Sequence, residues 1–120
     1  MNKSDELHSY LRKIAEKSKN GEIDWTQPNP STFNWRQSAN GDNYLVKIQK
    51  ARNPKYKFID NEKESVLMFQ VNSSKTRQTL ISLSTTERPE FYDVLTEIFK
   101  GAEMGIDIRS SRVLEKLLRP

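Results

Sequence analysis

Hydrophobic residues recur at helical spacing in two parts of the chain. Near the start, Leu7, Leu11 and Ile14 fall on one side of a helix that Gly21 brings to an end. After residue 90, a longer apolar stripe predicts a second and longer helix. Its members are Phe91, Val94, Leu95, Ile98, Phe99 and Ala102. The pattern therefore predicts two amphipathic helices, each with one face for a core.

Strict alternation of apolar and polar residues marks the middle of the chain. Residues 32–37 and 44–50 alternate, and the Asn40-Gly41 pair between them favours a two-residue type I′ hairpin turn. With this turn as the loop, the expected cross-strand pairs are Trp35 with Val46, Phe33 with Ile48 and Gln37 with Tyr44. The bulky residues of both strands then share one face.

Two more strands are expected, over residues 66–71 and 76–83. Before the hairpin, Pro28 and Pro30 exclude a helix and predict a stiff extended connection. Residues 51–65 are charged and interrupted by a proline, so we expect a loop or a ragged strand extension there. The sheet is therefore expected to be a meander of four strands.

The end of the chain predicts one more helix. Gly101 and Gly105 are expected to end the long helix, and a short helix then carries the last apolar residues, Val113, Leu114, Leu117 and Leu118. The sequence thus predicts a single α+β domain over residues 1–120, an antiparallel four-stranded meander packed by an N-terminal helix and by one long plus one short C-terminal helix. Packing of the last helix inside the domain is favoured, and a homodimer contact through its four apolar residues is the alternative.

The composition indicates the cellular compartment of the protein more clearly than its function. Among 120 residues, 34% are hydrophobic and 30% are charged, with a net charge of +4 and no cysteine. The lack of cysteine excludes disulfides and thiolate chemistry and is typical of a reducing compartment. No stretch approaches the roughly 20 apolar residues of a membrane-spanning helix. We therefore expect a cytoplasmic protein with no membrane partner.

Residues that could support catalysis are sparse and scattered. His8 is the single histidine, and we expect it on the exposed side or the flank of the first helix. Ser73 and Ser74 lack the G-x-S-x-G setting of a hydrolase nucleophile. The acidic residues at positions 60–64 lack calcium-loop spacing, and the glycines fit turns and helix ends rather than a phosphate-binding loop. The sequence therefore predicts no catalytic residue, no metal site and no cofactor.

The segment between Asp42 and Asp60 is the strongest lead to a partner, because it contains five cations and no acid. The candidate partner-binding residues are Lys47, Lys50, Arg52, Lys55, Tyr56 and Lys57. If the polar sheet face and the adjoining loop offered them together, the cations could neutralise phosphates while Tyr56 stacks on an unpaired base. Two other interpretations stay open, an acidic protein surface as the partner and a solvated strand edge that lysines keep from aggregating.

The order of these features resembles a recurrent type of small bacterial or phage α+β domain. The residues that carry the resemblance are Gly21-Glu22-Ile23-Asp24-Trp25, Phe33-x-Trp35, the apolar run from Phe91 through Ala102 and the leucine-rich end of the chain. Domains with this order of elements are similar to accessory modules of bacterial defence and counter-defence systems. The resemblance therefore implies a binding role, and the positive charge of this chain argues against mimicry of DNA.

A non-enzymatic interaction domain is the function that these observations favour. The apolar residues are accounted for by the fold, no catalytic set is visible, and the resemblance implies an accessory or inhibitor role. A protein partner is the leading expectation. Nucleic-acid binding through the basic hairpin is the alternative, and such binding would weaken steeply with salt.

Overall fold

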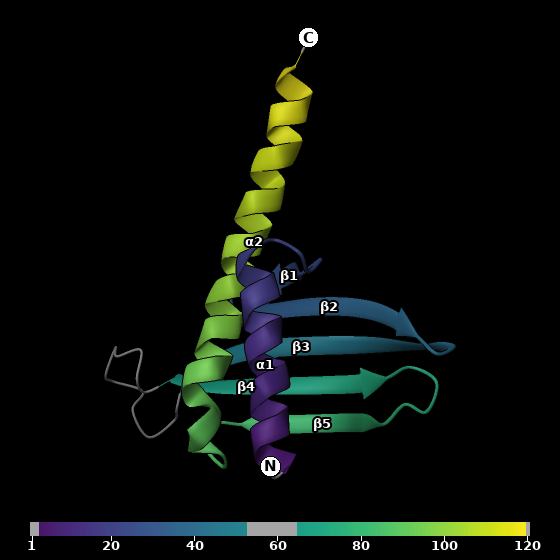
Figure 1. The fold of residues 1–120 in the computed structure, drawn as a ribbon, viewed down its shortest axis with the longest axis vertical. Helices are drawn as coiled ribbons and strands as arrows, with labels where there is room; N and C mark the ends of the chain where they lie inside the picture. The colour runs from purple at the N-terminus through teal and green to yellow at the C-terminus, as the bar shows by residue number, and fades with distance from the viewer. Residues whose placement is uncertain (1–2, 53–64, 120) are drawn as a thin grey trace.

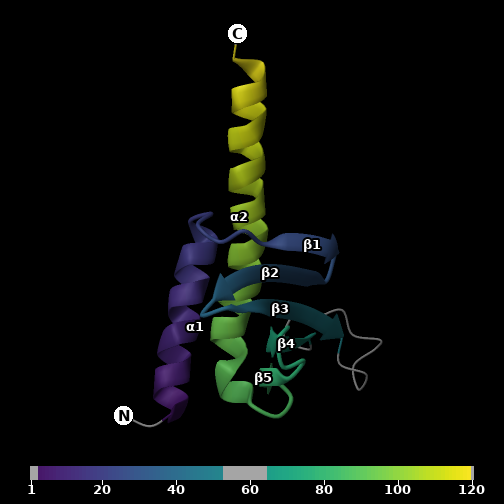
Figure 2. The same cartoon turned by 90° about the vertical axis from the view of Figure 1, so that its right-hand side faces the viewer.

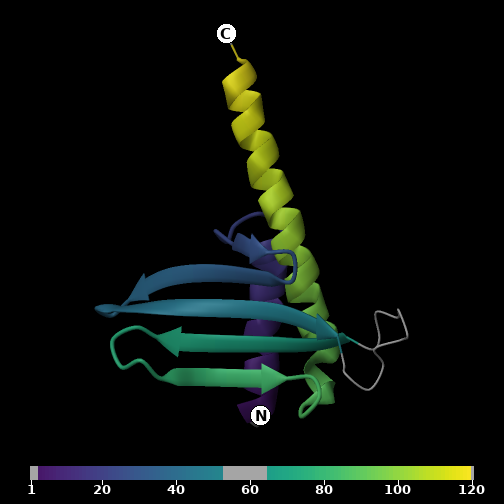
Figure 3. The ribbon, with the colours of Figure 1, turned by 180° about the vertical axis from the view of Figure 1, so that it is seen from behind.

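The computed structural model describes residues 3–52 and 65–119, and within them the fold is α+β. Helices α1 (Lys3–Lys19) and α2 (Tyr92–Leu118) lie against one face of a five-stranded antiparallel sheet (Figure 1). No described helix covers the other face (Figure 3). The strands lie side by side in sequence order as β1 (Thr26–Asn29), β2 (Thr32–Ala39), β3 (Asp42–Arg52), β4 (Ser65–Ser73) and β5 (Thr79–Ser84). A 3-10 turn, η3 (Pro89–Phe91), precedes α2.

The predicted hairpin of β2 and β3 is confirmed in both its turn and its register. Asn40 and Gly41 have φ angles of 51° and 77°, which is the left-handed conformation that a type I′ turn requires. The cross-strand pairs are the expected ones, Trp35 with Val46, Phe33 with Ile48 and Gln37 with Tyr44. The period-2 pattern and the turn residues were therefore sufficient to define this part of the sheet.

The sheet has five strands rather than the expected four, because the proline-containing segment forms the edge strand β1. Thr26 pairs with Asn34 and Asn29 pairs with Thr32, and the register shifts between these two pairs. Pro28 has no N–H group to donate, which an edge strand tolerates and an inner strand does not. The extended backbone predicted from the prolines agrees with the structure, whereas the pairing of this segment with β2 leaves no mark in the sequence pattern.

The C-terminal region forms one continuous helix, so the prediction of a long helix followed by a short one is wrong. Gly101 and Gly105 lie inside α2, where they permit close packing instead of ending the helix. A Cβ atom added at Gly105 would lie 2.5 Å from the carbonyl oxygen of Ser18, and one at Gly101 would lie 3.1 Å from the carbonyl oxygen of Ala15. The cost of a glycine inside a helix, about 1 kcal/mol, is therefore offset by the close approach of α1.

The core lies between the sheet and the two helices, and its largest fully buried side chains are Trp25, Phe33, Phe69 and Phe91. Phe99 of α2 meets Phe33 of β2 edge to face, with ring centroids 4.9 Å apart. The indole N–H of Trp25 donates to Ser18 Oγ at 2.8 Å, and the Ser18 hydroxyl donates to the carbonyl oxygen of Ile14 at 2.6 Å. Each of these buried donors is thus hydrogen-bonded, as burial requires.

The second half of α2 leaves the body of the protein and extends past β1 (Figure 1, Figure 2). Every residue from Ser110 to Arg119 is exposed. The exposed fractions of the apolar side chains are 55% for Val113, 59% for Leu114, 73% for Leu117 and 84% for Leu118. The expectation that this segment packs inside the domain is therefore wrong, because the described sheet ends at β1 while the helix continues. We call residues 110–118 the projecting segment.

Replacement of Gly105 by alanine tests the close crossing of the helices. Gly105→Ala should lower the free energy of unfolding by about 1–3 kcal/mol, because the new methyl group meets the Ser18 carbonyl and forces the helices apart. Urea denaturation of the full chain measures the change. Ser111→Ala, on the exposed part of the same helix, is the control and should stay within about 0.5 kcal/mol of the parent. Equal stability of Gly105→Ala and the parent would contradict the packing, since alanine is otherwise the better helix former.

Candidate interaction surfaces

The basic residues singled out from the sequence do not all lie on one surface. Lys47 is on the uncovered face of the sheet, between Asn34 and Gln70 on the neighbouring strands. Lys50 is on the opposite face, where its Nζ atom lies 5.7 Å from the centroid of the Phe99 ring of α2. The two lysines are three positions apart on one strand, and this odd spacing separates their faces. The Arg52 side chain and residues Lys55, Tyr56 and Lys57 lie outside the described residues.

The uncovered sheet face has two cations and several amides within the described strands, beside the apolar side chains of Leu45 and Met68. Its side chains include Asn34, Arg36, Lys47, Gln49, Gln70 and Asn72, as the cross-strand pairs place them. The five described strands contain one acid, Asp42, and its carboxylate bonds to Ser73, which lies on the other face. A face with two cations, several amides and no carboxylate can donate hydrogen bonds to the oxygen atoms of a polyanion and attract its negative charge.

The projecting segment has an apolar stripe with polar residues opposite. Val113, Leu114 and Leu117 follow Ile106 at spacings of 7, 8 and 11 residues, which puts them on one side of the helix. The residues on the other side are Arg112, Glu115 and Lys116. A shallow groove of about 420 Å³ runs along the stripe and is lined by Ile106, Arg109, Ser110, Val113 and Leu114. The stripe is the largest cluster of exposed apolar side chains in the described chain.

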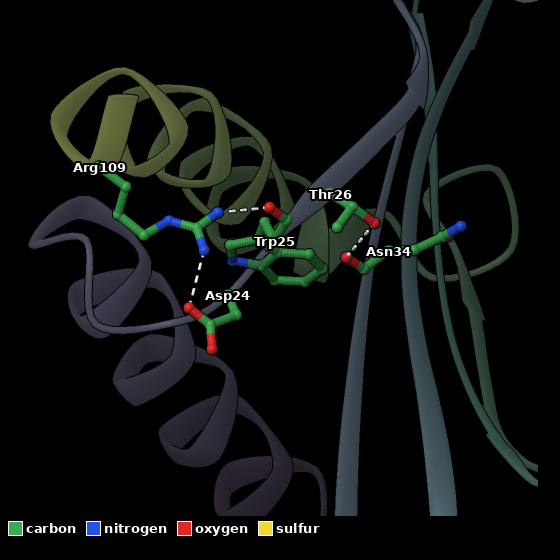
Figure 4. A network of polar contacts seen from close by, with 5 residues as sticks. All are labelled: Asp24, Trp25, Thr26, Asn34 and Arg109. Atoms are coloured by element: carbon green, nitrogen blue, oxygen red, sulfur yellow. Dashed lines mark hydrogen bonds and ion pairs between the residues drawn. The ribbon is translucent and has the colours of Figure 1, made fainter. Parts of the chain in front are cut away.

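A polar network fixes the point where α2 leaves the body (Figure 4). Arg109 Nη1 lies 2.7 Å from Asp24 Oδ1, and Arg109 Nη2 donates to the backbone carbonyl of Trp25. Just inside this point, Gly21 contacts Ile108, since a Cβ atom on Gly21 would lie 3.2 Å from Ile108 Cγ2. Charge-assisted bonds to a loop whose tryptophan is buried hold the root of the projecting segment in one direction. No sequence pattern indicated Arg109, because its partners Asp24 and Trp25 lie 85 and 84 positions away in the chain.

Two further hollows lie against α2. One, of about 100 Å³, is lined by Lys50, Thr96, Phe99, Lys100 and Glu103 among others, and the Thr96 hydroxyl there is buried without a partner among the described residues. It is far smaller than the roughly 300–1,000 Å³ of most ligand pockets. The other is an open groove of about 450 Å³ between α1 and α2, with Ala15 and Gly101 among its lining residues.

Residues with catalytic potential are placed in structural roles. His8 is half-buried with its ring 5.4 Å from that of Phe91, which fits the flank of the helix better than a fully solvated position. Ser73 is buried, and its hydroxyl donates to Asp42. Within residues 3–52 and 65–119, no group of three His, Cys, Asp or Glu residues is arranged to hold a metal ion. The acids of positions 60–64 lie outside the described residues.

Asp42 ties the turn between β2 and β3 to the turn between β4 and β5. Its carboxylate accepts hydrogen bonds from Ser73 Oγ at 2.5 Å, from Lys75 N at 2.9 Å and from Asn43 N at 2.7 Å. The bond from Ser73, followed by those from the two backbone amides, lowers the pKa of Asp42 below its ordinary value. A lowered pKa means that these bonds stabilise the fold above the ordinary pKa of an aspartate, and that the stabilisation is lost as the pH falls through the lowered value.

The comparisons with known proteins give no match. The chain matches no protein-family model, no curated protein and no solved structure. Among the described residues, no helix has the length and apolar character needed to cross a bilayer. Function is therefore argued from the geometry and charge of the surfaces.

Removal of the Ser73 hydroxyl tests the origin of the Asp42 shift. In Ser73→Ala, the pKa of Asp42 should rise toward its ordinary value, because the strongest hydrogen bond to the carboxylate is lost. An NMR titration of the side-chain carboxyl carbons measures this pKa. Ser74→Ala is the matched control, since Ser74 bonds to Asn43 through its backbone N–H alone among the described contacts. An unchanged Asp42 pKa in Ser73→Ala would show that the hydroxyl is not the cause.

Proposed function

We propose that this protein is a non-enzymatic interaction domain that binds a protein partner through the projecting segment. One observation carries the proposal: four large apolar side chains are 55–84% exposed on a helix that extends beyond the body that it packs against. Exposed apolar clusters with polar neighbours are typical of protein-binding surfaces. The resemblance noted from the sequence favours an accessory or inhibitor role in a bacterial or phage defence system.

The division of α2 into two parts supports this proposal. Its first part supplies Val94, Leu95, Ile98 and Ala102 to the core, and these residues are at most 3% exposed. The projecting segment contributes no residue to that core. Its apolar residues therefore do not serve the stability of the described fold, and burial by a partner would give each leucine roughly 1.5–3 kcal/mol.

A paired substitution on the stripe tests the proposed function. The immobilised Leu114→Ser/Leu117→Ser chain should bind its protein partner with an affinity at least about 100-fold lower than that of the parent, because two leucines are lost from the interface. The measurement passes cell extract, supplemented with free copies of the chain, over each immobilised protein. Arg112→Ser/Glu115→Ser, on the polar side of the same helix, is the matched control and should bind as the parent does. Circular dichroism confirms that all variants stay folded, and equal retention by the leucine and control variants would refute the proposal.

Nucleic-acid binding is a second candidate, and the uncovered sheet face is the observation that favours it. Arg36 and Lys47 lie on this face with amide side chains around them and no acid from the described strands. The face proposed here differs from the hairpin surface inferred from sequence, because Lys50 points to the helices. Affinity from two phosphate contacts would be modest and would not depend on base sequence.

Salt dependence tests this second candidate. In a fluorescence titration with labelled single-stranded nucleic acid, Arg36→Gln/Lys47→Gln should reduce the slope of log affinity against log salt by about 2, since two phosphate contacts are lost. Lys13→Gln/Lys17→Gln removes the same charge from α1, on the other side of the sheet, and should leave the slope closer to that of the parent. Binding that is absent, or that both pairs weaken equally, would remove the sheet face as a nucleic-acid site.

A further inference from the structure

We infer that the partner of the projecting segment is the same segment of a second copy, paired with it as antiparallel helices about a two-fold axis. This inference rests on the proposed function, since it names the occupant of that same surface. Three features of the described chain carry it: the direction in which the stripe faces, the distribution of charge along α2, and the nature of the neighbouring sheet edge.

The stripe continues the row of α2 that packs on the sheet. Residues seven apart lie on nearly the same side of a helix, so Phe99, Ile106 and Val113 form one row. Phe99 contacts Phe33 of β2, and Ile106 packs partly buried against the core. Val113 therefore faces the same side of α2 as this row, on the projecting segment that extends past β1 (Figure 1).

This direction decides how a second helix can lie. A partner helix seated on the row in parallel orientation would run back along α2 and collide with β1 and β2, which occupy that side (Figure 2). An antiparallel partner arrives with its own tip first and reaches only the level of Ile106, while its body lies beyond the tip of the first copy. The paired levels are then Ile106 with Leu117 of the second copy and Ser110 with Val113 of the second copy. Steric exclusion thus selects the antiparallel arrangement.

Charges along α2 favour the same arrangement. The tip of α2 and the residue that follows it, residues 112–119, have one acid, Glu115, and three cations. The cations are Arg112, Lys116 and Arg119. Near the root lie the acids Glu103 and Asp107, with Glu22 in the adjacent loop and Arg109 paired to Asp24. Antiparallel pairing brings each basic tip to the acidic root of the other copy, whereas parallel pairing would set the two basic tips side by side.

The neighbouring sheet edge disfavours a strand as the occupant. Pro28 in β1 cannot donate a hydrogen bond, and the register of β1 is already irregular. A helix needs no hydrogen bonds from that edge. A two-fold pair also uses every apolar residue of the stripe twice, so that a short segment supplies a self-complementary contact. Because the segment is only roughly 13 Å long, the interface is smaller than the standard size, and we expect a dimer that dissociates on dilution.

Measurement of mass against concentration tests the dimer. In sedimentation equilibrium the full chain should approach twice its mass of 14.0 kDa as the concentration rises. Leu114→Ser/Leu117→Ser should raise the dissociation constant at least about 100-fold. Arg112→Ser/Glu115→Ser tests the opposite side of the helix, and its dissociation constant should stay within about tenfold of that of the parent. A parent that stays monomeric, or a dimer that the leucine changes leave intact, would overturn the inference.

Single cysteines test the orientation, because the chain has no cysteine of its own. Under oxidising conditions, an equimolar mixture of Asp107→Cys and Leu118→Cys chains should form the mixed disulfide in preference to either homodimer. Self-linking of Leu118→Cys in preference to the mixed product would indicate parallel tips and would overturn the antiparallel arrangement. Dilution below the dissociation constant should abolish the mixed product, and a product that persists unchanged there would count against a specific dimer.

The two proposals can fail separately. If the parent is monomeric while another protein from the extract binds in a manner that needs Leu114 and Leu117, the second copy is excluded and the proposed function stands. If the parent neither dimerises nor retains any protein through these residues, both proposals are overturned.

Discussion

The close crossing of α1 and α2 is the constraint on which the rest of the structure depends. Gly105 lets the backbone of α2 approach the Ser18 carbonyl, and Gly101 does the same beside Ala15. Because the helices are this close, the Ser18 hydroxyl lies within reach of the Trp25 indole, which satisfies the N–H of a side chain that is 1% exposed. A larger residue at either glycine would push the helices apart. It would thereby also disturb the contacts of α1 and α2 with the loop that precedes β1.

From this crossing follows the position of the projecting segment. Trp25 is anchored in the core, so its carbonyl and the neighbouring Asp24 are fixed acceptors for Arg109. The exposed ion pair to Asp24 contributes little stability by itself, since surface pairs contribute about 0–1 kcal/mol. Its effect is geometric, because it ties the last half-buried turn of α2 to the body. The stripe beyond it is thus presented in a defined direction, which lowers the entropic cost of binding.

Two surfaces with different chemistry remain open, and they are held apart by the fold. The uncovered sheet face is polar and carries Arg36 and Lys47, whereas the projecting segment presents an apolar stripe. In the proposed pairing, the second copy lies beyond the β1 edge and not over the uncovered face, so that the sheet face would stay accessible in the dimer.

Local patterns in the sequence determined the hairpin, the end of α1 and the apolar rows of both helices, because turn residues and side-chain periodicity act over a few positions. The Asn40-Gly41 turn defined register, and the stripe from Phe91 to Ala102 defined a helix. Only the tertiary structure decided the role of Gly101 and Gly105. The sequence pattern predicts helix ends at both glycines, whereas in the fold they allow α1 to pack closely against α2. It also decided that β1 pairs with β2, that the helices cover the sheet face of Lys50 and leave the face of Lys47 open, and that Val113 and Leu117 have no core to join. These features depend on which distant segments meet, and a pattern within one segment does not contain that information.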